Sequence, residues 1–216
     1  MFRSIVRATA ALALVAGTAQ AQFTQDAGFR LRNTSGSAAQ EELYYGFSND
    51  LGSQPRLAVN GTFALNQPNA FSLDWDATAR RLEFVYRGFS GPSRSYVLTY
   101  DVGATPSFNA IRFILRGSEA SRTSLSGIAL ASSSAEFSLG DLVANDGAVS
   151  RIFEGVSAAE SFRVTGDLTF AGAGVNGEGQ RFEVGVGTVV PEPSTYALMA
   201  TGLIGLAGMA RRRRRA

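Results

Sequence analysis

Residues 71–76 read Phe-Ser-Leu-Asp-Trp-Asp, and this stretch decides the fold together with its return at 82–86. In both segments a large apolar residue recurs at every second position, which is the period of a strand with one face in a core. Residues 76–79 predict a turn between them, so the stretch predicts an antiparallel hairpin. The side chains expected to face the core are Phe71, Leu73, Trp75, Leu82, Phe84 and Tyr86.

Short alternating segments of the same kind recur along the chain between turn signals, and no convincing amphipathic helix precedes residue 195. We count about ten strands, so the sequence predicts an all-β fold, a single jelly-roll-like β-sandwich domain at residues 22–188. Many of the 15 phenylalanines of the chain lie at inward positions of these segments and would supply its core. The other expected strand segments are 57–59, 97–99, 111–116, 125–130, 137–139, 149–153, 162–170 and 182–186.

The composition excludes several kinds of chemistry, because the 216 residues include neither cysteine nor histidine. No disulfide can form, and cysteine nucleophiles, Cys/His zinc sites and triads with a histidine base are excluded. We therefore predict no cofactor and no metal site.

The charge of the chain is divided unevenly between its ends and its middle. Of the 20 basic residues, all arginine, seven lie at the ends, at Arg3, Arg7 and 211–215. Glu192 is the one acid of the 18 that lies outside residues 22–188, so 13 arginines and 17 acids remain in the middle. The net charge of the domain is therefore near −4, which predicts that nucleic acid is not a partner.

Residues 1–21 have the pattern of a secretory signal peptide. Two arginines precede an apolar run at 8–17, and Ala19 and Ala21 fit the small-x-small cleavage pattern. We expect signal peptidase to cut before Gln22; the alternative is a short anchor that is never cut.

The C-terminus has three parts: a proline-containing segment, an apolar helix expected at 195–210 and an arginine cluster. Fifteen apolar residues in a helix reach about 22 Å, against a hydrocarbon core of about 30 Å, and flanking residues can extend the span. The arginines cannot cross cheaply and stay cytoplasmic, which leaves the middle of the chain outside. The cluster consists of Arg211, Arg212, Arg213, Arg214 and Arg215.

Pro191, Glu192 and Pro193, followed by the short helix and the arginine cluster, resemble the PEP-CTERM sorting signal of Gram-negative bacteria, over residues 189–216. The resemblance implies that an exosortase, a membrane-embedded protease, recognises the triad and cleaves the tail. The protein would be held transiently in the inner membrane and then reach the cell surface or the exopolysaccharide matrix. Two prolines suit this role because they prevent the helix from continuing and keep the segment extended.

The middle of the chain also resembles the choice-of-anchor β domains, most of all the W type, which occur with interchangeable sorting tails. Residues 71–76, 109–113, 139–142 and 162–167 carry this resemblance. It implies a β domain and no particular activity.

Two acidic pairs are candidate sites. Asp74 and Asp76 share a face of their strand and could bind calcium, although the more common role is that of polar residues before a turn. Glu41 and Glu42 could supply half of a glycosidase pair, although an adjacent acid pair in a polar loop is usually solvated.

Tyr44 and Tyr45 are candidates for stacking on sugars, because successive residues of a strand point to opposite faces and one of the two would be exposed. Trp75 shares a face with apolar residues and is expected in the core. The glycine-rich segment 172–179 joins two expected strands and predicts a hairpin loop rather than a phosphate cradle.

These observations favour a non-enzymatic, exported surface or matrix protein that is associated with exopolysaccharide or a biofilm. The first alternative is a carbohydrate-binding module that uses exposed tyrosines. The second is a glycoside hydrolase with two carboxylates.

Overall fold

A computed structural model of the chain describes residues 22–33, 41–47, 63–88, 94–101, 105–133, 136–172 and 179–190. Apart from Gln22, these residues belong to one compact unit, Phe23–Val190. The predicted signal peptide, the expected strand at 57–59 and the sorting tail with its helix at 195–210 lie outside the described residues. Among the described residues there is no helix long and apolar enough to cross a membrane.

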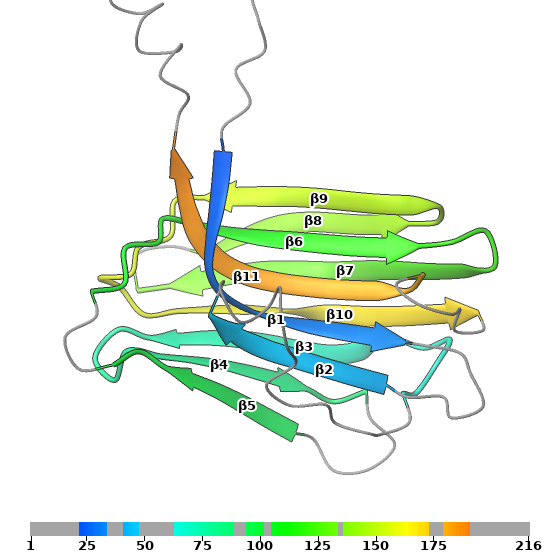
Figure 1. Cartoon of the computed structure of the whole chain (residues 1–216), viewed down its shortest axis with the longest axis horizontal. Helices are drawn as coiled ribbons and strands as arrows, with labels where there is room; N and C mark the ends of the chain where they lie inside the picture. The colour runs from blue at the N-terminus through cyan, green and yellow to red at the C-terminus, as the bar shows by residue number, and fades with distance from the viewer. Residues whose placement is uncertain are drawn as a thin grey trace, which may run out of the picture. The chain divides into compact units, whose positions relative to one another are not determined.

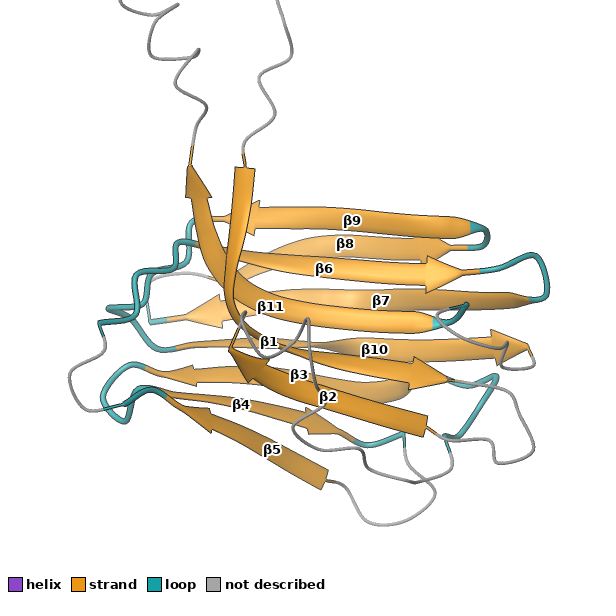
Figure 2. Ribbon diagram, viewed as in Figure 1, coloured by secondary structure: helices purple, strands orange, loops and turns teal. Residues whose placement is uncertain are grey.

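Two antiparallel sheets packed face to face form the described unit, which confirms the predicted all-β sandwich (Figures 1 and 2). One sheet has the strand order β2-β1-β11-β6-β9 and the other the order β5-β4-β3-β10-β7-β8. The chain passes from one sheet to the other after β2, β5, β6, β8, β9 and β10. The strands are β1 (Gln22–Asn33), β2 (Glu41–Phe47), β3 (Asn69–Asp76), β4 (Arg81–Tyr86), β5 (Arg94–Thr99), β6 (Ala110–Gly117), β7 (Ser121–Ser132), β8 (Glu136–Ala144), β9 (Gly147–Glu154), β10 (Phe162–Gly172) and β11 (Arg181–Val190).

The hairpin predicted from residues 71–86 is present as β3 and β4. Phe71 lies opposite Tyr86 and Trp75 opposite Leu82. The Oδ1 atom of Asp76 accepts hydrogen bonds from the backbone N–H groups of Thr78 and Ala79, both at 2.9 Å, and so holds the turn. All six side chains expected to face the core are buried.

The core lies between the two sheets and is built largely of aromatic rings. Phe84 of β4 lies 5.1 Å from Phe29 of β1, and Phe71 of β3 lies 5.4 Å from Phe182 of β11, measured between ring centroids. Such tilted and offset pairs contribute about 0.5–1.5 kcal/mol each beyond the area that they bury. Trp75 is buried as predicted, and its Nε1–H donates to the carbonyl oxygen of Ala158 at 3.1 Å.

Two expectations are corrected. Glu41 and Glu42 were expected in a polar loop, but they begin β2, which pairs with β1 in register from Asn33↔Glu41. The segment 172–179 does join two strands, but β10 and β11 belong to different sheets, so the connection is a crossover and not a hairpin. The sequence pattern could not show this, because sheet membership depends on partners far away in the chain.

The first and last strands lie side by side in the five-stranded sheet, where β1 is the neighbour of β11 (Figure 1). The backbone N–H of Asn33 donates to the carbonyl oxygen of Gln180 at 3.1 Å, so the end of β1 meets the beginning of β11. Near the other end of β1, a Cβ added at Gly187 would collide with the carbonyl oxygen of Thr24. The two strands therefore run antiparallel, and the described unit begins and ends at one end of this sheet.

Candidate functional site

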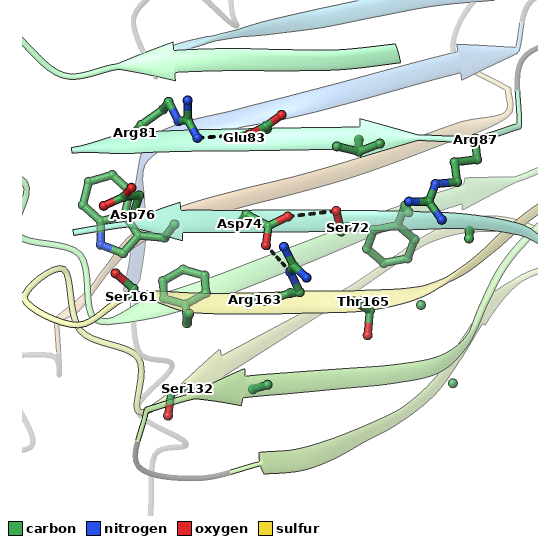
Figure 3. Close-up of a pocket in the computed structure, with 18 of the residues that line it drawn as sticks. Ser72, Asp74, Asp76, Arg81, Glu83, Arg87, Ser132, Ser161, Arg163 and Thr165 are labelled. Atoms are coloured by element: carbon green, nitrogen blue, oxygen red, sulfur yellow. Dashed lines mark hydrogen bonds and ion pairs between the residues drawn. The ribbon is translucent and has the colours of Figure 1, made fainter. Parts of the chain in front are cut away.

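A groove of about 1050 Å³ lies on the outer face of the six-stranded sheet, over β4, β3, β10 and β7 (Figure 3). Charged and hydroxyl side chains from the outward positions of these strands line it. Under the groove lie Phe71, Trp75 and Phe162, which are buried on the core side. Its outward-facing polar residues are Ser72, Asp74, Asp76, Arg81, Glu83, Arg87, Arg163, Thr165 and Asp167.

Strand register arranges the charges in rows across the sheet. Arg163 of β10 lies opposite Asp74 of β3, which lies opposite Glu83 of β4. Directly opposite residues have Cβ atoms about 4.5–5.5 Å apart, so the two carboxylates are neighbours. Two like charges at this spacing repel each other unless cations lie beside them.

Asp74 is held by two partners. Arg163 donates through Nε to Oδ1, and the Ser72 hydroxyl donates to Oδ2 at 2.9 Å (Figure 3). The hydrogen bond that Arg163 donates to Asp74 and, after it, the charge of Asp74 raise the pKa of the Arg163 guanidinium. Arg163 therefore bears a permanent positive charge in the middle of the groove.

Glu83 is held in the same way by different partners. The Ser95 hydroxyl donates to Oε1, and Nη2 of Arg81 lies 3.4 Å from Oε2. Each carboxylate thus has one arginine and one serine, and both oxygens of each are engaged.

The groove is deep where the outward side chains are small. Ala131 and Gly127 of β7 lie beside β10, and the register between these strands shifts between Thr165 and Asp167. The backbone N–H of Gly127 donates to the Asp141 carboxylate at 3.0 Å, which fixes the irregular part of β7. The result is a polar channel whose walls offer guanidinium, carboxylate and hydroxyl groups, and this chemistry suits a ligand rich in hydroxyl groups.

Asp74 and Asp76, the candidates for a calcium site, have different partners in the structure. Asp74 pairs with Arg163, while Asp76 holds the turn after β3. Within the described ranges no three acidic side chains converge in a way that could hold a metal ion.

Tyr45 points to the core side of β2. Its ring centroid lies 6.0 Å from that of Phe29 and 5.9 Å from that of Tyr96, and its side chain is half-buried. The side chain of Tyr44 is outside the described residues, as are those of Glu41 and Glu42. Sugar stacking by these tyrosines stays a prediction.

Sequence patterns alone did not identify Arg81, Glu83 or Arg163 as members of a site. Strand alternation places Glu83 on the outer face of β4, opposite the predicted Asp74. Arg163 is 89 residues from Asp74, and only the pairing of β10 with β3 brings them together.

A second feature concerns the end of β11, which runs to Val190, beyond the expected domain end at 188. The amide of Asn109 bonds both backbone groups of Val189: Val189 N–H donates to Oδ1 at 2.8 Å, and Nδ2 donates to the Val189 carbonyl at 3.3 Å. The Thr188 hydroxyl donates to the carbonyl of Ser107 at 3.2 Å. The last residues of the strand are therefore fixed by side chains as well as by the sheet.

Comparison with known proteins identifies the segment that begins at the end of this strand. Residues 189–215 match the family model of the PEP-CTERM protein-sorting motif, which confirms the predicted sorting tail. No curated protein matches the chain. The resemblance of the middle to the choice-of-anchor domains stays a prediction. Among the predicted recognition and cleavage residues, Gln22 begins β1 and is exposed, whereas Ala19, Ala21, Pro191, Glu192, Pro193 and the five arginines lie outside the described residues.

Proposed function

Because the chain carries a PEP-CTERM sorting motif, which makes it an exported, membrane-anchored protein processed by an exosortase, we propose that its β-sandwich is a non-catalytic component of the cell surface or extracellular matrix. The match at 189–215 is the observation that carries this proposal. In it, Pro191, Glu192 and Pro193 are the residues that the exosortase reads.

The arginine cluster supports a definite orientation during processing. Arg211–Arg215 would remain on the cytoplasmic side of the inner membrane, because moving five charges across the hydrocarbon core is costly. The sandwich then lies outside. Cleavage of the tail removes this anchor, after which the sandwich is either released or kept at the surface of a Gram-negative cell.

The chemistry of the described residues supports a non-catalytic role. The chain has no histidine or cysteine, and the hydrolase alternative depends on a pair of carboxylates. In Asp74 and Glu83, which lie opposite each other in register, both oxygens of each carboxylate contact an arginine or a serine. A two-carboxylate hydrolase would require one of them to give up these partners.

The groove supports a second candidate function, the binding of exopolysaccharide. Guanidinium and carboxylate groups are planar and can each make paired hydrogen bonds with neighbouring hydroxyl groups of a sugar. The groove joins three such groups, at Asp74, Glu83 and Arg163, on one rigid sheet. The groove thus supports carbohydrate binding in addition to the predicted stacking of sugars on Tyr44 and Tyr45.

The intact mass of the mature protein from host cells tests the proposed sorting. It is compared with a variant in which Pro191, Glu192 and Pro193 are all replaced by alanine. We expect the wild-type protein to end near the triad and the variant to retain its arginines. If both keep the full tail, the exosortase does not process this protein and the proposed function is wrong.

A further inference from the structure

We propose that the folded sandwich sets the N-terminal limit of tail processing, and that Asn109 is the positioning residue that fixes this limit. The inference rests on the proposed processing by an exosortase. It adds a structural reason why cleavage takes place after Val190 and not before it.

The first observation is that fold and motif overlap. The sorting motif begins at residue 189, while β11 continues through Val190. Pro191 follows directly and has no N–H to donate to a strand ladder. No spacer separates the sheet from the triad.

The second observation is the double hydrogen bond between the Asn109 side chain and Val189. It satisfies both the N–H and the carbonyl of Val189, at 2.8 and 3.3 Å. Asn109 is itself held by its backbone, because its N–H donates to the Gly187 carbonyl at 3.0 Å and its carbonyl accepts from Gly155 N–H at 3.2 Å. The amide therefore acts from a fixed position at the junction of β6, β9 and β11.

The third observation is the change in exposure at this point. Val189 is 6% exposed, whereas its neighbour Val190 is 50% exposed. Val189 is therefore the last buried side chain of β11, whereas Val190, the next residue of the same strand, points outward.

These observations limit where a protease can act. A protease binds its substrate as an extended strand and needs the backbone N–H and carbonyl groups beside the bond that it cuts. Those of Val189 are occupied by Asn109. Cleavage breaks one peptide bond: its acyl group passes to water or to an acceptor amine, and its amino group leaves with the tail. In the folded protein this bond lies on the C-terminal side of Val190.

The test uses the full-length chain with its tail, in detergent, and Asn109→Ala. Pancreatic elastase, which cuts after small aliphatic residues, probes the strand end without any exosortase. We expect Asn109→Ala to raise the rate of cleavage after residues 188 and 189 by about fivefold to tenfold, as the loss of partly exposed hydrogen bonds predicts. Asn109→Asp keeps the acceptor for Val189 N–H but loses the donor, and should lie between wild type and Asn109→Ala.

Asn145→Ala is the matched control, because Asn145 is an exposed asparagine in the connection between β8 and β9. It should leave the elastase pattern unchanged. The thermal unfolding midpoint of each variant separates a local release from general destabilisation: for a local release, cleavage elsewhere in the domain stays at the wild-type rate. Equal cleavage after residues 188 and 189 in wild type and Asn109→Ala would overturn the role of Asn109.

The same variants expressed in host cells test the link to processing. Wild-type product should carry no C-terminus before Val190, whereas Asn109→Ala should add products that end at residues 188–189. A single, unchanged product in Asn109→Ala means that the triad alone sets the cut and that the fold sets no limit. If the wild-type protein keeps its whole tail, the proposed sorting fails, while the elastase result still reports on Asn109.

Discussion

Asp74 and Glu83 lie directly opposite each other on neighbouring strands, and each carboxylate has its own arginine and its own serine. This arrangement turns a repulsive pair into a fixed row of charges across the sheet. The effect of this row on stability differs from its effect on the surface charge of the groove. The two arginines are the exposed partners, so the ion pairs contribute little to stability, but they give this face its pattern of charge.

Replacing Arg163 by alanine tests the groove as a polysaccharide site. The Arg163 side chain is 65% exposed, so we expect the free energy of unfolding to fall by less than about 1 kcal/mol. Exopolysaccharide from the host should raise the melting temperature of the wild-type domain, and this shift should disappear in Arg163→Ala. Arg116→Ala, an exposed arginine on the other sheet, is the control and should keep the shift. A full shift in both variants would remove the groove as the binding site.

Glu183 of β11 is the opposite case, because it is buried between two arginines. Its Oε1 lies 2.5 Å from Nε of Arg30 and 3.2 Å from Nε of Arg181. Glu183→Gln leaves both guanidinium groups without this countercharge, so we expect a loss of about 2–3 kcal/mol in urea unfolding. Glu83→Gln in the exposed groove should cost less than about 1 kcal/mol. Similar losses in the two variants would contradict the difference in burial.

The environment of Tyr100 predicts that the free energy of unfolding falls at alkaline pH. Burial, the charge of Asp26 and the hydrogen bond that the hydroxyl donates to Asp26 at 2.9 Å raise the pKa of Tyr100 above its usual range. The resulting stability is fully present below the unfolded pKa of about 10 and is lost as pH rises above it, because the unfolded chain then releases a proton that the folded protein keeps.

Tyr100→Phe provides the comparison for this pH effect. At pH 7 it should cost about 1 kcal/mol through the lost hydrogen bond. Between about pH 9 and 11 the difference between wild type and variant in free energy of unfolding should shrink, because the variant has no proton to release there. A difference that stays constant over this range would show that Tyr100 titrates as it does in the unfolded chain.

Gly187 tests the pairing of the first and last strands. A Cβ at this position would collide with the carbonyl oxygen of Thr24, so we expect Gly187→Ala to destabilise the domain by about 3 kcal/mol. Gly147→Ala is the control: its positive φ of 76° strains an alanine, but no atom lies within 4 Å of the added Cβ. It should cost about 1 kcal/mol. Equal losses would mean that β1 and β11 can move apart without cost.

Local patterns were enough to predict the hairpin of β3 and β4, because its register depends on residues close together in sequence. They were not enough for β1, where Ala27 and Gly28 interrupt the alternation that resumes at Phe29. The groove required the pairing of β10 with β3, whose register is set by the whole sandwich. The sorting tail was predictable because its three parts follow one another directly in the sequence.

The position of β11 has a consequence for the timing of export. β11 is the strand that joins β1 and β2 to β6 and β9, so without it the five-stranded sheet is in two pieces. If the predicted signal peptide leads export, the N-terminus crosses the membrane first and this strand crosses last, just ahead of the sorting triad. Most of the domain must therefore wait outside the membrane in an incomplete state, and the sheet closes only as the tail arrives. Completion of the fold and presentation of the tail thus become one event.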